Sequence, residues 1–330
     1  MKKIGVLLLL ALAGVAAAQQ SGQNTIASAT VPDKNSGDQP ATVQTSANFP
    51  TVQMAKPTYA DLYCAGMISK QLLPNANYVA GGLQTPNTTK YVTGDVVYLA
   101  GSGYQPGAQY SIVRELRDMN KYEVYPGQHA LLAVTGQPYA ELGWVKILDT
   151  RSKMAIAQVE FSCDSILPGD VAIPFTEKSI VNFHAPVKFD RFAPASDKLS
   201  GRIVLAKDFD AILGTGMKVY LNVGANQGVK IGDYFRAVRG YDADRKDPVD
   251  VLSYKASIGE DTQKKHPSYG HIPLVKNDGP TIHINDMPRR AVGEIVVINV
   301  TPTTATGMIT FALEDVHIGD GVELEVAEQQ

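Results

Sequence analysis

The sequence predicts a mainly β protein made of tandem small β-barrels or sandwich modules, with one short N-terminal helix. Short runs rich in β-branched and aromatic residues, such as DVVYLAG, GWVKILD and GEIVVINV, follow one another along the chain. Gly, Pro, Asn or Asp bound these runs, as is typical of short strands joined by tight turns. The second indication is that the same series of runs occurs twice.

The repeat is clearest in the stretches 143–171 and 293–321, which align without a gap. They read GWVKILDTRSKMAIAQVEFSCDSILPGDV and GEIVVINVTPTTATGMITFALEDVHIGDG. Each predicts a strand, a polar turn, a second strand and a Gly-Asp turn. Each copy also opens on the letters VYL, in the stretches 97–114 and 219–239. We therefore expect two similar β modules that arose by duplication.

Gly-Asp pairs mark the turns of the repeat. A glycine adopts the positive φ of a tight turn at little cost, and an aspartate accepts hydrogen bonds from nearby backbone amides. The predicted turn positions are Gly169, Asp170, Gly232, Asp233, Gly319 and Asp320.

The N-terminus predicts a cleaved signal peptide over residues 1–18. Lys2 and Lys3 precede an apolar run at 4–15, and small residues follow at 16–18. The run is too short to span the ~30 Å of a bilayer as a helix. We therefore expect a secreted protein, periplasmic or associated with the cell envelope, with no transmembrane segment in the mature chain.

Composition divides the rest of the chain. The segment after the signal is rich in Gln, Ser, Thr, Asn and Pro without a periodic apolar face, which is typical of a disordered linker. Apolar spacing predicts a short helix at Tyr59–Leu73. The predicted boundaries are a linker at 19–58, a first β module at 59–175, a connector at 176–200, and a second β module at 201–330 with an insert at 241–290.

Cys64 and Cys163 are the only cysteines. In an exported chain they predict a disulfide bond. Closing a loop of about 100 residues would contribute on the order of 4 to 5 kcal/mol in the chain-entropy model. The alternative is that one of them is a nucleophile with a histidine partner.

Two stretches of the repeat resemble known families. The stretch 219–239 resembles the C-terminal domain of the flagellar assembly protein T family, in which an Asn-x-Gly turn leads into a G-V-x-x-G-D-x-F-x-V-x-R strand. Its matching residues are Asn222, Gly224, Gly228, Val229, Gly232, Asp233, Phe235, Val238 and Arg239. The stretch 94–114 is similar to the region that follows the LysM module in LysM proteins, through Gly94, Asp95, Val97, Tyr98, Tyr110, Ile112 and Arg114. LysM itself is absent, and the resemblance implies SH3-like barrels in an envelope protein.

Four residues of the repeat are candidates for a binding surface. Tyr98 and Tyr220 occupy the same VYL position, where they would stack on sugar rings or lie half inside the barrel. Arg114 and Arg239 at strand ends would contact a ligand, extend along the surface, or pair with a carboxylate.

The insert carries the other candidates, His271 and His283, with Asp278 and Asp286 nearby. Imidazole and carboxylate groups can hold a divalent metal, although a solvated loop explains the same residues. The chain has no Gly-x-Ser-x-Gly, His-Glu-x-x-His, phosphate-loop or dinucleotide-binding motif. We therefore assign no catalytic residue, metal ligand or cofactor.

The function that these features predict is binding or scaffolding. A net charge of −3 with both signs spread along the chain argues against a nucleic-acid partner. We expect a secreted, non-enzymatic envelope protein whose partner is an envelope protein or peptidoglycan. The alternatives are a glycan-binding module, and a hydrolase or metal-dependent activity in the insert.

Overall fold

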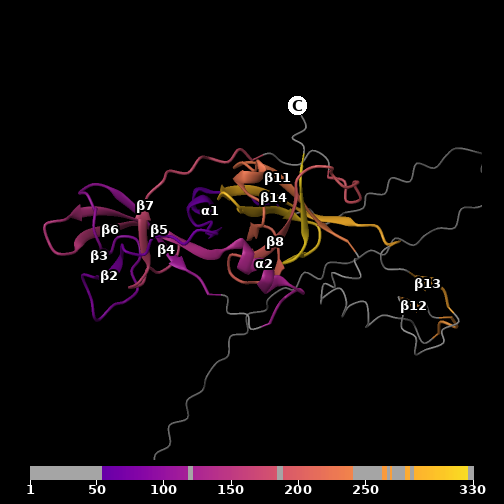
Figure 1. Cartoon of the computed structure of the whole chain (residues 1–330), viewed down its shortest axis with the longest axis horizontal. Coiled ribbons are helices and arrows are strands. Elements are labelled where there is room, and N and C mark those ends of the chain that lie inside the picture. Colours follow the sequence, from indigo (N-terminus) through magenta and orange to yellow (C-terminus); the bar gives the residue numbers. More distant parts are fainter. Residues whose placement is uncertain are drawn as a thin grey trace, which may run out of the picture. The chain divides into compact units, whose positions relative to one another are not determined.

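The chain forms two closed antiparallel β-barrels of six strands each (Figure 1). This confirms the mainly β class and the tandem small barrels that the sequence predicts. The computed structural model describes residues 54–117, 122–183, 189–240, 262–265, 268–269, 279–282 and 286–325. The predicted signal peptide, nearly all of the linker and most of the insert lie outside these residues.

Barrel 1 closes through the strand order β5-β4-β7-β2-β3-β6, with β6 pairing again with β5. A seventh strand, β1 (Met67–Ser69), adds to the edge of β5. The six barrel strands are β2 (Tyr78–Gly82), β3 (Val96–Ala100), β4 (Gln109–Glu115), β5 (Gln137–Asp149), β6 (Ala155–Ser162) and β7 (Val171–Pro174).

Barrel 2 closes through the order β10-β15-β14-β11-β17-β8. Its strands are β8 (Ser200–Ala206), β10 (Lys218–Leu221), β11 (Tyr234–Arg239), β14 (Arg290–Val300), β15 (Ala305–Ala312) and β17 (Gly321–Leu324). Strand for strand, this is the order of barrel 1. Smaller elements are the 3-10 turn η1 (Ala225–Gln227) and the strand pairs β9 (Ile212–Leu213) with β16 (Val316–His317), and β12 (Ser268–Tyr269) with β13 (Thr281–Ile282).

Each barrel encloses its own apolar core because alternate residues of a strand point to opposite faces. In β3 the pattern is regular, with Val97 and Leu99 fully buried and their neighbours half-buried. The core of barrel 2 contains the equivalent Val219 and Leu221.

The segment Thr58–Ser69, which we call the wedge, begins with α1 (Tyr59–Tyr63). Thr58 and Asp61 cap the helix reciprocally, since the Asp61 amide donates to Thr58 Oγ1 and the Thr58 amide donates to Asp61 Oδ2. The predicted helix at Tyr59–Leu73 is therefore too long. It ends at Cys64 because Gly66 has a φ of 69° and the next residues pair with β5 as β1.

A disulfide joins the wedge to barrel 1. Cys64 and Cys163 are bonded, with their Cα atoms 5.8 Å apart. This confirms the predicted bond and leaves neither sulfur as a thiol nucleophile. The bond fixes the end of α1 beside the end of β6.

Side chains of barrel 2 hydrogen-bond the carbonyl groups of the wedge. Thr306 Oγ1 donates to Gly66 O at 2.9 Å, and Thr304 Oγ1 donates to Ile68 O at 2.6 Å. Both threonines are almost completely buried. Because a buried carbonyl without a partner is costly, these hydroxyl groups allow the wedge to lie in the interior.

Barrel 1 and the connector bind the wedge from its other side. The Gly66 amide donates to Glu141 Oε2 at 3.0 Å. Lys178 pairs with Glu141 at 2.6 Å and donates to Leu62 O at 2.9 Å. Leu62 and Tyr63 pack in one apolar cluster with residues of both barrels. The wedge is therefore shared by the two barrels.

The wedge explains why equivalent strands differ in burial. Outward positions of β6, such as Gln158 and Glu160, are exposed. The equivalent positions of β15, Met308 and Thr310, are 1% and 0% exposed. Barrel 2 therefore uses both faces of this strand, one for its own core and one against the wedge.

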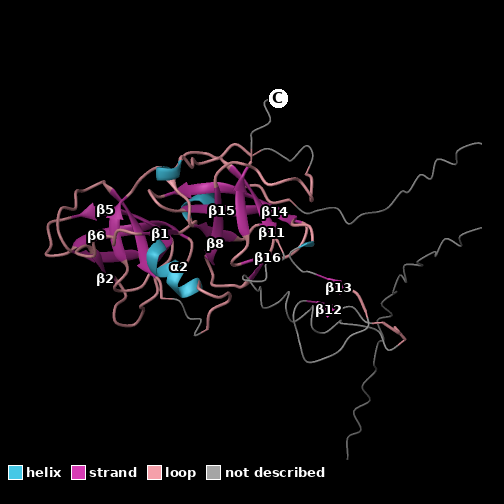
Figure 2. Cartoon of the chain, turned by 45° about the vertical axis from the view of Figure 1, so that its right-hand side comes forward, coloured by secondary structure: helices cyan, strands magenta, loops and turns pink. Residues whose placement is uncertain are grey.

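The helix α2 (Gln128–Thr135) was not predicted. It lies in the connection between β4 and β5, and Figures 1 and 2 show it beside β8 of barrel 2. Tyr125, just before the helix, joins the core cluster of barrel 2. Among the described residues, no helix is long and apolar enough to cross a membrane.

We predict that replacing both Cys64 and Cys163 by Ser lowers the free energy of unfolding by about 2 to 5 kcal/mol. The disulfide closes a loop with a sequence separation of 99 and ties the wedge to barrel 1. Urea denaturation followed by tyrosine and tryptophan fluorescence measures the change. Reduced wild-type protein should match the variant, and equal stability of all three forms would contradict the prediction.

Candidate functional site

The two candidate arginines each form an Arg–Asp clamp at the closing turn of their barrel. In barrel 1, Arg114 Nε and Nη2 donate to the two carboxylate oxygens of Asp170, both at 2.8 Å. Nη2 also donates to Ser165 O at 2.8 Å. The same carboxylate accepts the amide of Leu167. The clamp thus joins the end of β4 to the turn before β7.

Barrel 2 contains the same clamp atom for atom. Arg239 Nε and Nη2 donate to Asp320 at 2.9 and 2.8 Å, and Nη2 also donates to Asp315 O at 2.7 Å. The Asp320 carboxylate accepts the amide of His317. Arg239 is 6% exposed, so its side chain does not form part of a binding surface. The Arg114 side chain is 27% exposed and so remains accessible to solvent.

The Gly-Asp turns have the conformation that the sequence predicts. Gly169, Gly232 and Gly319 all have φ near +100°, between 92° and 100°. The remaining aspartate, Asp233, accepts the amide of Lys230 at 2.8 Å. All three aspartates therefore bind backbone amides three residues earlier in their own turns.

The two candidate tyrosines have different environments. Tyr220 is fully buried and its hydroxyl donates to Ala65 O of the wedge, so of the two alternatives for this residue, stacking on a ligand at the surface is the one that its position does not allow. Burial strongly raises the pKa of its hydroxyl. Tyr98 is half-buried on the outer side of β3, and Tyr78 of the neighbouring β2 is 41% exposed.

The histidine candidates of the insert are not described. His271 and His283 lie outside the described residues. Within the described ranges, no group of three or more His, Cys, Asp or Glu side chains could hold a metal ion. A role of the insert in metal binding or hydrolysis stays a prediction.

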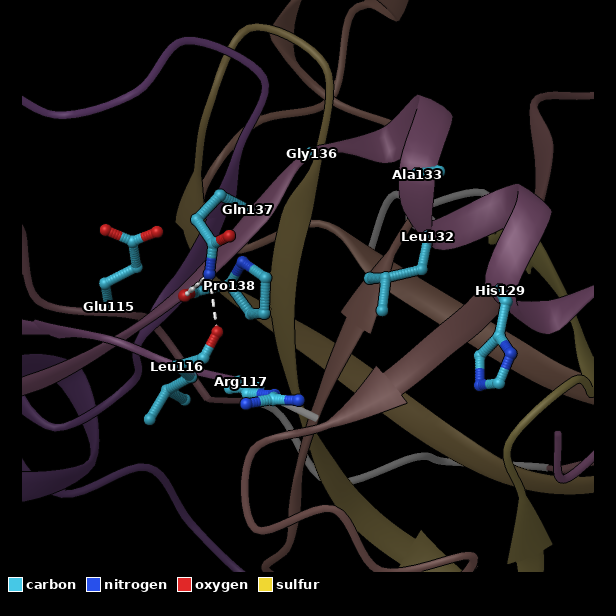
Figure 3. A pocket seen from close by; sticks show the side chains of 9 residues that line it. All are labelled: Glu115, Leu116, Arg117, His129, Leu132, Ala133, Gly136, Gln137 and Pro138. Carbon is cyan, nitrogen blue, oxygen red and sulfur yellow. Dashed lines mark hydrogen bonds between the residues drawn. The ribbon is translucent and has the colours of Figure 1, made fainter. Parts of the chain in front are cut away.

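A pocket of about 590 Å³ lies between α2 and the ends of β4 and β5 (Figure 3). This volume is in the range of small-molecule and side-chain binding pockets. Glu115 and His129 lie at opposite sides of it, and Arg117 lies between them. The residues that line the pocket are Glu115, Leu116, Arg117, His129, Leu132, Ala133, Gly136, Gln137 and Pro138.

Local hydrogen bonds fix the walls of the pocket. Gln137 Nε2 donates to Leu116 O at 2.5 Å and to Pro138 O at 3.0 Å, which joins the chain after β4 to the start of β5. His129 Nδ1 lies 3.8 Å from Glu123 Oε1. The Glu123 carboxylate also accepts the amides of Gly127 and His129, which lowers its pKa.

The pocket can bind an amphipathic group. Leu116, Leu132 and Pro138 offer apolar contact, while the rim carries a guanidinium, an imidazole and a carboxylate. Such a rim orients a ligand that has separate positive and negative ends. Sequence reasoning missed this site, although QHALLAVT is an apolar run without the polar face of a surface helix.

No protein-family model matches the chain. No curated protein is detectably similar to it in sequence.

We predict that Asp320→Ala lowers the free energy of unfolding by about 3 to 5 kcal/mol, since it leaves a buried guanidinium without its carboxylate. Asp170→Ala in barrel 1 should lower the free energy of unfolding clearly less, because the partly exposed Arg114 can turn toward water. Urea denaturation of the two variants tests this pair. Equal losses of unfolding free energy would show that the contribution of a clamp to stability does not depend on how deeply it is buried.

Proposed function

We propose that this protein is an exported, non-enzymatic binding or scaffolding protein of the cell envelope. The observation that carries the proposal is the pocket beside α2, an open amphipathic site held by a frame of two barrels joined through the wedge. Sites on rigid elements hold a partner more precisely than sites on loops. Buried charges within this frame pair with one another, as Glu141 does with Lys178.

Export is supported by two independent features. The N-terminal pattern is that of a signal peptide, and Cys64 is disulfide-bonded to Cys163, which suits an oxidising compartment. The resemblance to the barrels of flagellar assembly protein T and of LysM-associated regions suggests SH3-like modules and an envelope role. The partner would be an envelope protein or peptidoglycan.

Glycan binding is the second candidate function, and one observation favours it. Tyr78 and Tyr98 lie on neighbouring strands of barrel 1 with their rings at least partly accessible. Partly exposed tyrosine rings can stack on sugar rings while the hydroxyl group forms hydrogen bonds. A hydrolase or metal-dependent activity of the 241–290 insert remains a third hypothesis.

We predict that the mature protein, residues 19–330, retains an envelope protein or peptidoglycan in a pull-down, and that Leu132→Glu abolishes retention. The substitution places a charge on the apolar wall of the pocket. Ile180→Glu controls for the added charge alone, because Ile180 is 87% exposed outside the pocket, whereas Leu132 also packs against the buried cluster around Tyr220. Purified sacculi and detergent-solubilised envelope proteins are tested separately.

Two further variants distinguish the alternatives. Loss of sacculus binding in Tyr98→Ser, with Leu132→Glu unaffected, would favour the glycan-binding function. Loss only when the 241–290 insert is shortened would place the site in the insert. Undiminished protein binding by Leu132→Glu would contradict a role for the pocket.

A further inference from the structure

The two barrels differ sharply at one equivalent position on their outer surfaces. Trp144 in β5 lies opposite Phe161 of β6, and the two rings stack at 4.5 Å. In barrel 2 the equivalent register pairs Glu294 of β14 with Phe311 of β15. A carboxyl group thus replaces the indole of barrel 1.

A second aromatic residue is replaced by a carboxylate beside the first. The Phe175 amide donates to the first residue of β4, and the Glu325 amide donates to the first residue of β11. Phe175 and Glu325 are therefore equivalent. The positions that hold an aromatic pair in barrel 1 therefore hold the carboxyl pair Glu294 and Glu325 in barrel 2.

An aromatic side chain from another segment packs at this place in both barrels. In barrel 1 it is Tyr63 of the wedge, 4.9 Å from Trp144 and 5.7 Å from Phe175. In barrel 2 it is Phe189 of the connector, 4.9 Å from Phe311. The disulfide at Cys64 anchors the segment that carries Tyr63.

Arg236 lies close to both carboxyl groups and to the connector. Arg236 Nε donates to Glu325 at 3.1 Å, and the Arg236 guanidinium lies over the Phe189 ring at 5.7 Å. Glu294 is opposite Arg236 in the strand register and only 1% exposed. Thr310 Oγ1 donates to Glu294 Oε1 at 2.7 Å.

These surroundings favour a neutral Glu294. Burial, and then the neighbouring Glu325, raise the pKa of Glu294 to about 7, against the opposing effects of Thr310 and Arg236. Among the described residues, the charged groups facing Glu294 are Arg236 of β11 and Glu325 after β17. Thr310 of β15 faces it with a hydroxyl group.

The geometry points to a proton-controlled latch, in which neutral Glu294 leaves Arg236 paired with Glu325 and lying over the Phe189 ring, so that it holds this residue of the connector against barrel 2. When Glu294 loses its proton, two carboxylates compete for one guanidinium, and Arg236 is drawn from the face of the Phe189 ring. Release of Phe189 lets water reach Glu294. It also exposes Phe311 as a site for an aromatic side chain from another segment or molecule, as Tyr63 packs on barrel 1.

Linkage gives the direction of the pH dependence. The closed state binds the Glu294 proton more tightly than the open state, because water lowers the pKa of the exposed carboxyl toward its ordinary value of about 4.3. Raising the pH between the ordinary pKa and about 7 therefore favours opening. Above this window the effect is complete, and at lower pH the latch is closed.

Hydrogen exchange of the mature protein tests the latch. Protection factors, which remove the intrinsic pH dependence of exchange, are measured for a peptide that covers Phe189–Ala193 between pH 5 and 8. One linked proton predicts a fall in protection of up to about tenfold per pH unit from pH 5 to 7, followed by a plateau. In Glu294→Gln the protection should stay high and constant, since the amide keeps the acceptor for Thr310.

Two variants keep the result unambiguous. Glu325→Gln removes the neighbouring charge and should move the fall to lower pH. Glu314→Gln removes the carboxylate that pairs with Arg191 of the connector, and should lower protection at every pH without changing the slope. The latch is refuted if Glu294→Gln keeps the wild-type slope, or if wild-type protection does not change with pH.

Discussion

The wedge must bury backbone carbonyl groups between two barrels, and the rest of the structure depends on how these groups are satisfied. In a regular sheet, amides of a neighbouring strand would donate to the free edge of β1. Here the hydroxyls of Thr304 and Thr306 take that role for Ile68 and Gly66. A side-chain donor can serve an edge carbonyl where no strand can approach in register.

Contact with the wedge restricts which residues fit at the positions around it. Gly66 has no Cβ, and a Cβ there would lie 2.3 Å from the Tyr220 hydroxyl, so only glycine allows the approach. Tyr220 is held inside by the wedge, whereas Tyr98 at the same VYL position remains at the surface. The two barrels share one strand order, and contact with the wedge makes their equivalent faces different.

Local features of the fold could be predicted from the sequence, and long-range features could not. The Gly-Asp turns, the strand rhythm and the disulfide depend on nearby residues or on residue type, and these predictions were confirmed. Periodic spacing alone gave a helix to Leu73, because nothing in the sequence shows that residues after Cys64 pair with β5. The burial of Tyr220 likewise depends on a segment 155 residues away.

The candidate site was even less accessible to sequence reasoning. The pocket is formed by the ends of β4 and β5 together with α2, and its apolar residues are separated along the chain. The carboxyl group of Glu294 was also missed, because its place in a long apolar run reveals neither the burial nor the neighbouring Glu325. Both sites appear only when the strand register is known.

The most direct test of this account is calorimetric unfolding of the mature protein and of the double variant Thr304→Val, Thr306→Val. If the wedge joins the barrels, the wild type should unfold in one transition with equal calorimetric and van't Hoff enthalpies. The variant should then unfold in two transitions, because its wedge carbonyls have lost their closest donors and keep only Asn299 Nδ2 and Thr301 Oγ1, each at 3.3 Å. Two transitions already in the wild type would show that each barrel is stable without the wedge, and would contradict the account.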